Sequence, residues 1–239
     1  ASPLIWRLRM VKSPAEIAKV ERACRIGSDG YAALPGQLSA GMNEHDIART
    51  FRAELTRQGA DAIPFMAVTA GTGGYDQIIV GPNDRNLAPG DVLFIDLGVT
   101  YDGYFCDFDR NFACGDVDDE TRKTQDIVWR ATEAGIAAAR PGATPADLAA
   151  AMAGVMADAG ATGGNVGRLG HGLGLQLTEP PSNMAGDKTV LEPGMVMTIE
   201  PGMDYGDGKM LVHEENVVIT EDGCRLLTAR APRDMWQIG

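Results

Sequence analysis

The segment DVLFIDLGVTYDGYFCDFDRNFA, residues 91–113, constrains the fold of this chain more than any other part of it. It consists of two apolar stretches joined at Asp102-Gly103, the dipeptide that best suits a type I′ hairpin turn. With these two as the loop residues, counting back along both strands places Asp96 opposite Asp109. The period of two along a strand then predicts one shared face for the aspartates of the hairpin, Asp96, Asp107 and Asp109.

Three carboxylates on one face repel one another, and their ionised forms are costly to bury unless a cation neutralises them. A solvated acidic face is the simpler interpretation, and for isolated aspartates it is usually correct. The neighbouring residues favour a buried hairpin instead, because they are large and apolar: Phe94, Ile95, Leu97, Phe105 and Phe108. The hairpin therefore predicts a metal site.

The remainder of the chain predicts the order helix, helix, strands, and then the same order again. In the first half a helix begins after Ser13, with Glu16 completing a capping box, and a second begins after Asn43. In the second half a helix runs to Pro141-Gly142, and an Ala-rich one runs from Thr144-Pro145 to Gly160. Strands are expected at 64–69, 195–199 and 210–219. We expect an α+β chain of two similar halves around a shared sheet.

Composition limits the classes of partner. With 239 residues, 44% of them hydrophobic and 23% charged, the chain is typical of a globular protein with one domain. A net charge of −12 disfavours nucleic acid and anionic membranes, which attract proteins through a positive field. We expect no nucleic-acid partner and no membrane partner, but a small molecule, a peptide or a cation.

The four cysteines are scattered without a CxxC pair, which predicts neither a zinc ribbon nor a disulfide framework. No apolar run is long enough to span a bilayer, and the opening ASPLIWRLRM lacks the apolar core of a signal peptide. A reducing compartment, and hence a cytoplasmic location, is the expectation.

Three further residues have the chemistry of metal ligands: His171 in GHGLGL, Glu200 in TIEPG and Glu214 in VHEENVVIT. Each alone is a weak signal, since a histidine between glycines is more often a loop residue and a Glu before Pro-Gly often just ends a strand. Together with Asp96 and Asp107 they make four carboxylates and one imidazole. This mostly hard oxygen set suits manganese, iron, cobalt or zinc better than copper.

The order and spacing of these five residues resemble the creatinase, aminopeptidase P, prolidase and methionine aminopeptidase family, whose fold is called pita-bread. LRMVKSPAEIAKVERA resembles the start of that family's catalytic domain, and ENVVITEDG resembles its end. The resemblance implies two pseudo-symmetric halves around a curved, mostly antiparallel sheet. Members usually carry a smaller N-terminal domain, so residues 1–12 are expected to be the remnant of a linker and residues 13–239 the catalytic domain. Relatives commonly form dimers, and an exposed end at Met235-Trp236 would fit a homodimer interface.

The resemblance also implies roles for the five residues. Asp96 would bind one divalent ion, His171 and Glu200 would bind the other, and Asp107 and Glu214 would bridge the two. A water between the ions would become hydroxide and attack an amide carbonyl, as in other two-metal hydrolases. Glu200 is the candidate for moving a proton to the leaving amine.

The chain departs from the family at positions that contact substrate. Two histidines of the family's peptidases are absent, with Ile78 or Ile79 at the first position and Thr178 at the second. Each lost donor is worth about 2 to 4 kcal/mol of stabilisation of a tetrahedral intermediate, so Thr178 is a candidate to stand in for one. Asp109 replaces the family's usual threonine, either favouring a cationic substrate or merely pairing with Arg110 or a lysine.

The two remaining histidines do not replace the missing pair. His45 is expected to be structural or exposed, and His213 to point away from Glu214 on the opposite face of a strand.

Three functions remain open at this level. The leading one is a two-metal hydrolase of the Xaa-Pro peptidase type, supported by the intact ligand set. The second is a family member that acts on a C–N bond of a small charged solute, or as a lyase, which the missing histidines and Asp109 favour. The third is a non-catalytic binding module, against which the five retained ligands count.

Overall fold

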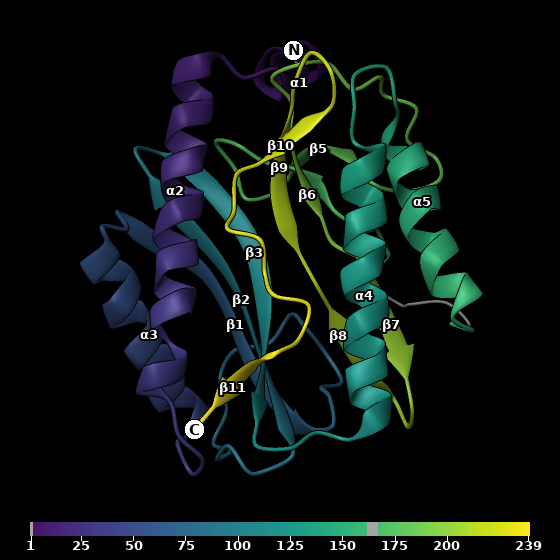
Figure 1. Ribbon diagram of the computed structural model, residues 1–239. Coiled ribbons are helices and arrows are strands. Elements are labelled where there is room, and N and C mark those ends of the chain that lie inside the picture. Colours follow the sequence, from purple (N-terminus) through teal and green to yellow (C-terminus); the bar gives the residue numbers. More distant parts are fainter. Residues whose placement is uncertain (1, 162–166) are drawn as a thin grey trace.

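The computed structural model describes residues 2–161 and 167–239, and in it helices lie beside β-sheets in two halves (Figure 1). The first half consists of helices α1 (Ser2–Met10), α2 (Pro14–Ala33), η1 (Pro35–Gln37) and α3 (Glu44–Gln58), and strands β1 (Ala62–Thr72), β2 (Asp91–Tyr101) and β3 (Tyr104–Cys114). Helices α2 and α3 pack on these three strands.

The second half repeats the order with helices α4 (Asp119–Ala138) and α5 (Pro145–Asp158). Its strands are short: β4 (His171–Gly172), β5 (Glu179–Ser182), β6 (Val196–Ile199), β7 (Gly202–Tyr205), β8 (Lys209–Val212), β9 (Glu215–Ile219), β10 (Cys224–Leu226) and β11 (Trp236–Ile238). Helix α4 packs on α5 and on β6, β7 and β8. The predicted order of helices and strands is confirmed.

The strands form two main sheets, with the orders β1-β2-β3-β11 and β10-β9-β6-β4-β5, and a separate β7-β8 hairpin. The sheet that the sequence predicts as shared is thus divided in its hydrogen bonding, and its two parts meet where β3 contacts β9. Among the strands of the described residues, all pairings are antiparallel except that of β11 with β3. The α+β class with a mostly antiparallel sheet is confirmed.

The hairpin of β2 and β3 has the predicted turn and register. Asp102 and Gly103 have positive φ angles of 48° and 82°, as a type I′ turn requires. Asp96 pairs with Asp109 across the two strands. Both strands are almost wholly buried, because helix α2 packs on the hairpin while β1 contacts β2, and β8 and β9 contact β3.

The helix starts follow their predicted caps. Ser13 and Glu16 form a capping box at α2, and Asn43 caps α3. Helix α2 can approach the hairpin closely because of Gly27, where an added Cβ would lie 2.8 Å from the ring of Phe108.

Two expectations about strands and ends are wrong. The strand expected at 210–219 is two strands, β8 and β9, because the chain leaves the ladder at His213 and Glu214. Met235 and Trp236 are half-buried rather than exposed, since β11 adds to the first sheet and the Trp236 ring packs 5.4 Å from that of Phe112.

Residues 1–12, expected to be a linker remnant, include helix α1, which is anchored to the second half. Arg9 and Lys12 both form ion pairs with the buried carboxylate of Glu179 at the start of β5. No helix in the described part of the chain has both the length and the apolar character needed to cross a bilayer.

Candidate metal centre

The hairpin of β2 and β3 supplies the floor of the candidate site. Asp96, Asp107 and Asp109 are all buried, with exposed fractions of 8%, 5% and 1%. The hydroxyl of Tyr31 on α2 lies 2.8 Å from the carbonyl oxygen of Ile95 and 3.0 Å from that of Phe108, so it ties both strands to the helix behind them. The aspartates are therefore held on a rigid support.

His171 is brought to this floor by two glycines. A Cβ at Gly170 would lie 2.3 Å from the carbonyl oxygen of Thr198, and one at Gly172 would lie 2.4 Å from that of Pro180. The histidine between glycines is thus a strand position that needs close approach to its neighbours on both sides. His171 Nδ1 donates to the carbonyl oxygen of Gly172 at 2.9 Å, which leaves Nε2 with a free lone pair toward the aspartates.

Glu200 and Glu214 come from the ends of short strands. Glu200 follows β6, and its amide donates to the carbonyl oxygen of Leu169, next to the His171 strand. Glu214 lies between β8 and β9, where the neighbouring His213 amide donates to the carbonyl oxygen of Pro201. Glu214 thus lies at a break in the ladder, and its carboxylate lies within 4.8 Å of the ligand atoms of Asp107 and His171.

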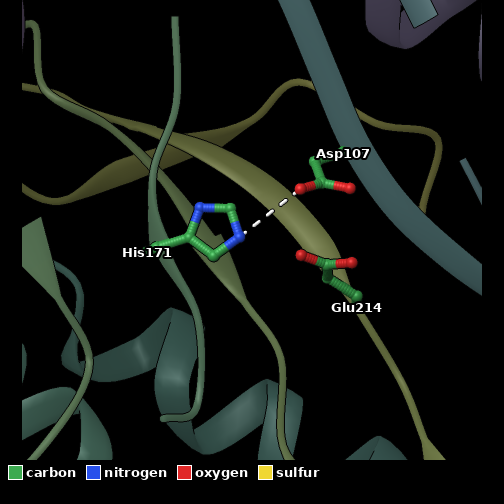
Figure 2. A group of neighbouring side chains, drawn as sticks. All are labelled: Asp107, His171 and Glu214. Carbon is green, nitrogen blue, oxygen red and sulfur yellow. Dashed lines mark ion pairs between the residues drawn. The ribbon is translucent and has the colours of Figure 1, made fainter. Parts of the chain in front are cut away.

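Three of the five predicted ligands converge tightly. Asp107, His171 and Glu214 offer ligand atoms that all lie within 4.8 Å of one another, and their side chains point toward a common centre in Figure 2. His171 Nε2 is 3.4 Å from Asp107 Oδ2. Asp96 and Glu200 lie outside this tight group, but they line the same cavity as Asp107 and His171.

The free carboxylate oxygens of this centre fit a cation. Buried oxygens without a hydrogen-bond partner in the described structure include Asp96 Oδ1, Glu214 Oε1 and both carboxylate oxygens of Asp109. Buried acceptors are normally paired, because an unmet carboxylate oxygen loses its hydration without compensation. A set of unpaired carboxylate oxygens beside one free imidazole nitrogen has the chemistry of a site for hard divalent metals.

Without a cation, burial favours the protonated forms of these acids. Burial, and after it the charges of Asp107 and Glu200, raises the pKa of Asp96 well above its usual value. Burial also raises the pKa of Glu214 strongly, with Glu200 as the next cause, and that of Glu200 to about 7. The pKa of His171 is lowered, chiefly by burial. A neutral imidazole is the form that binds metal.

A cavity of about 210 Å³ opens onto the centre. Its floor holds Asp96, Asp107, His171 and Glu200. Its walls are mostly apolar, formed by Phe65, Ile78, Ile79 and Leu177. A larger hollow lies between α4 and β7, but the residues that line it include no histidine.

The family is identified by comparison with known proteins. A model of metallopeptidase family M24 matches residues 18–221. The chain belongs to metallopeptidase family M24.

This M24 chain is 36% identical over 225 residues to a probable dipeptidase PepE of Mycobacterium bovis, covering 93% of the chain and 60% of that protein. It is 32% identical over 226 residues to an Xaa-Pro dipeptidase of Pyrococcus furiosus, covering 94% and 65%. The crystal structure of dipeptidase PepE from Mycobacterium ulcerans superposes with a TM-score of 0.93 at 34% identity, over 100% of this chain and 64% of that one. The predicted pita-bread fold is confirmed, and the chain spans less than two thirds of these relatives' lengths.

The positions that the resemblance marks as replacements of substrate-contacting histidines lie at the cavity of this M24 chain. Ile78 and Ile79 both line its wall, and the Ile79 side chain is 84% exposed at the mouth. Thr178 lines the opposite part and accepts a hydrogen bond of 3.2 Å from Arg168. Arg168 is missed by the sequence reasoning, although its place three residues before His171 could have drawn attention to it.

Asp109 does not pair with Arg110 or with a lysine, so that simpler interpretation is wrong. Arg110 lies on the other face of β3 and donates to the carbonyl oxygens of Asp109 and Glu214 and to the Glu215 carboxylate. In the described structure no hydrogen bond or ion pair reaches the Asp109 carboxylate. Burial, followed by the charge of Asp96, raises its pKa well above the usual value.

The other two histidines lie away from the centre. His45 is on α3 with its ring 3.7 Å from Asp84. His213 is buried on the face opposite the metal centre, 3.0 Å from Thr132 Oγ1, and burial lowers its pKa to about 3.

Asn216 is a second residue that the sequence reasoning misses. Its side-chain oxygen accepts from the amide of Asp107 at 3.1 Å, and its side-chain nitrogen donates to the carbonyl oxygen of the same residue. This pair of bonds fastens β9 to β3, and so fixes Glu214 relative to Asp107.

Proposed function

We propose that this protein is a metal-dependent dipeptidase that hydrolyses the amide bond of a small peptide, with Xaa-Pro dipeptides as the first substrates to test. One observation carries the proposal: four carboxylate or imidazole ligands face a single cavity of about 210 Å³. That volume is below the range of about 300 to 1,000 Å³ for drug-sized ligands, which favours a small substrate. The names of the similar proteins, dipeptidase and Xaa-Pro dipeptidase, support the same class.

The ligand assignments are part of this proposal. We assign Asp96 to one divalent ion, His171 and Glu200 to the other, and Asp107 and Glu214 to both. Manganese, iron, cobalt and zinc all suit this ligand set. Two such ions would supply an activated water and a Lewis acid for the substrate carbonyl.

The residues around the ions then have separate tasks. Glu200 lines the cavity floor, where it is placed to carry a proton to the leaving amine. Arg168 and Thr178 are the polar groups of the cavity wall, and we assign them to hold the backbone or the carboxylate of the peptide. The apolar side chains of Ile78 and Phe65 would exclude water from the other side of the substrate.

A second candidate is hydrolysis of a C–N bond in a small charged solute. It is favoured by one observation, that His171 is the only imidazole among the described residues lining the cavity. A peptidase of this type then depends on Arg168 and Thr178 for donors that histidines supply elsewhere. A non-catalytic binding module is disfavoured, because unpaired buried carboxylates are costly to a protein that binds no metal.

The test is an assay of the purified protein, loaded with MnCl₂, against Ala-Pro, Pro-Ala and Ala-Ala, with creatine as the non-peptide solute. Release of proline from Ala-Pro that ceases in EDTA and returns with Mn²⁺ is the expected result. Turnover of creatine alone would move the function to the second candidate. A protein that holds metal and cleaves none of the dipeptides would overturn the dipeptidase proposal.

Thr178 and Arg168 can be tested on the same assay. Thr178→Val keeps the shape of the side chain and removes its hydroxyl, so kcat should fall by about tenfold or more if the hydroxyl stabilises developing charge. Arg168→Lys keeps the charge and should raise KM more than it lowers kcat, because it loses the planar fork. An unchanged kcat in Thr178→Val would show that the hydroxyl has no part in catalysis and that the side chain only packs in the cavity wall.

The cellular compartment and the oligomeric state are part of this proposal. We infer a reducing compartment, the cytoplasm, since the four cysteines are free in the structure. A homodimer stays a prediction, which sedimentation of the purified protein would check.

A further inference from the structure

Asp109 is the buried carboxylate whose two oxygens both lack a hydrogen-bond partner among the described residues. Its side chain is 1% exposed. It lies directly opposite Asp96 in the register of β2 and β3, so the two carboxylates project from the same face. Among the described residues only the charge of Arg110 offsets part of the cost of burying it, and no donor contacts its oxygens.

Other buried carboxylates of this protein show what a structural role requires. Asp91, at the start of the same hairpin, accepts from the Thr72 hydroxyl, from Arg85 and from the amide of Ala88. Glu44 accepts from the amides of Ala70 and Asn83. Both are buried as deeply as Asp109. Asp91 and Glu44 thus each accept hydrogen bonds that connect neighbouring segments. Asp109 accepts none, so it does not hold segments together in this way.

The unpaired oxygens near Asp109 belong to one charge cluster. The Asp109 charge acts on the Glu214 carboxylate, and those of Asp96 and Glu200 act on Asp109. Asp96 and Glu214 each carry a further oxygen without a partner. A cation near Asp96 would meet unpaired oxygens of this cluster, which the Arg110 guanidinium does not do because it donates to Glu215 and to the carbonyl oxygen of Ala229 on the opposite face.

We propose that Asp109 is a sixth metal-binding residue, which holds one of the two divalent ions together with Asp96. The inference rests on the metal centre of the proposed function and extends it at one subsite. A further carboxylate adds a hard oxygen ligand and a negative charge, which favours a hard ion such as Mn²⁺ at the Asp96 subsite. The two subsites therefore differ in character, one rich in carboxylates and the other built on the His171 imidazole.

The experiment compares wild type with Asp109→Asn, which removes the charge and keeps the shape. MnCl₂ is titrated into the metal-free proteins by calorimetry, and Tm is measured in EDTA and in excess Mn²⁺. Wild type is expected to bind about two ions per chain. Asp109→Asn should bind one of them at least about tenfold more weakly and the other unchanged. Its Tm in EDTA should be equal to or higher than that of wild type, because the Asp109 carboxyl makes no hydrogen bond that the substitution would remove.

Asp91→Asn is the matched control, since it removes a buried aspartate with a full set of partners. It should lower Tm in EDTA and leave both Mn²⁺ affinities unchanged. Asp109→Thr also removes the charge and gives a second measurement if Asp109→Asn folds poorly. It should likewise bind one of the two Mn²⁺ ions more weakly.

Two results overturn the proposal. In the first, each Asp109 variant binds both Mn²⁺ ions with wild-type affinity. In the second, the Asp109 variants retain both affinities and show a lower Tm in EDTA, as Asp91→Asn does. These differ from failure of the proposed function. Wild type that binds two ions and hydrolyses no dipeptide overturns the dipeptidase activity alone, whereas wild type that binds no Mn²⁺ overturns the metal centre and the role of Asp109 together.

Discussion

The segments Asp109-Arg110 and Glu214-Glu215 each place one buried charged residue toward the candidate metal centre and the next toward the opposite side, and the two sides differ in how those charges are paired. On one face Asp109 and Glu214 leave carboxylate oxygens unpaired. On the other, Arg110 is 3.0 Å from Glu215, which also accepts from Arg230. Residues that are neighbours in sequence thus lie in two different regions. One has carboxylate oxygens without a partner, and in the other the buried charges form ion pairs with each other.

The chemistry of the groups follows this division. Although burial tends to raise it, the pKa of Glu215 is lowered by Arg110 and His213. The pKa of Glu214, one residue earlier, is raised by burial and by the surrounding carboxylates. The protein therefore offsets the burial cost of Glu215 with its own cations, whereas at the candidate metal centre it leaves carboxylate oxygens without a partner.

The largest effect is expected on the metal face from Asp107→Ala. If the proposed centre is correct, Asp107→Ala loses both metal ions and its kcat/KM falls by at least about 1,000-fold, equivalent to about 4 kcal/mol, since the ions would supply nucleophile and Lewis acid together. Metal content by elemental analysis and the Ala-Pro assay measure the two losses. Asp46→Ala, at an exposed position of α3, is the control and should change neither. Retention of both ions in Asp107→Ala would contradict the bridging role.

The next effect is on the ion-pair face. Arg110→Met should lower the free energy of unfolding by about 3 to 5 kcal/mol, because it leaves Glu215 short of a partner in a buried place. Urea denaturation in EDTA measures it. Arg225→Met breaks the exposed pair with Glu21 and should cost less than about 1 kcal/mol. If Arg110→Met changed Mn²⁺ affinity without changing stability, the two faces would not be separate regions.

The smallest effect, taken per pH unit and per proton, is a difference in the pH dependence of stability. Without metal, the folded-state pKa values of Asp96 and Glu214 are raised and that of Glu200 is about 7, whereas unfolded carboxylates ionise near about pH 4. The folded state therefore holds extra protons above about pH 4, and its stability is lost as pH rises toward about 7, by up to about 1.4 kcal/mol per pH unit for each proton.

Metal displaces these protons, so the stabilisation by Mn²⁺ should grow between about pH 5 and about pH 8. On the other face the sign is reversed. The folded-state pKa of His213 is about 3, so below about pH 6.5 the unfolded chain binds a proton that the folded chain does not, and the protein loses stability as pH falls. Urea denaturation with and without Mn²⁺ across this range separates the two, since the His213 contribution cancels in the difference. A stabilisation that shrinks with rising pH would contradict the assignment of the carboxylates to metal.

Much of the fold follows from local patterns in the sequence. The type I′ turn at Asp102-Gly103 fixes the register of the hairpin, and the period of two then sets which residues share a face with Asp96. The capping box at Ser13 fixes the start of α2 in the same local way. The strand expected at 210–219 fails because the break at His213 and Glu214 carries no Gly or Pro signal.

The alternation of residues along β2 and β3 thus sets the aspartate cluster, because a strand's own backbone orients its side chains. The sequence could not show that Arg168 reaches the cavity, that Asn216 holds Asp107, or that Arg110 turns from Asp109 toward Glu215. These contacts join segments up to about a hundred residues apart, and they form only when the two apolar cores bring β3 against β9. Local geometry selects neighbours within an element, whereas long-range packing selects which charges become partners and which are left for a cation.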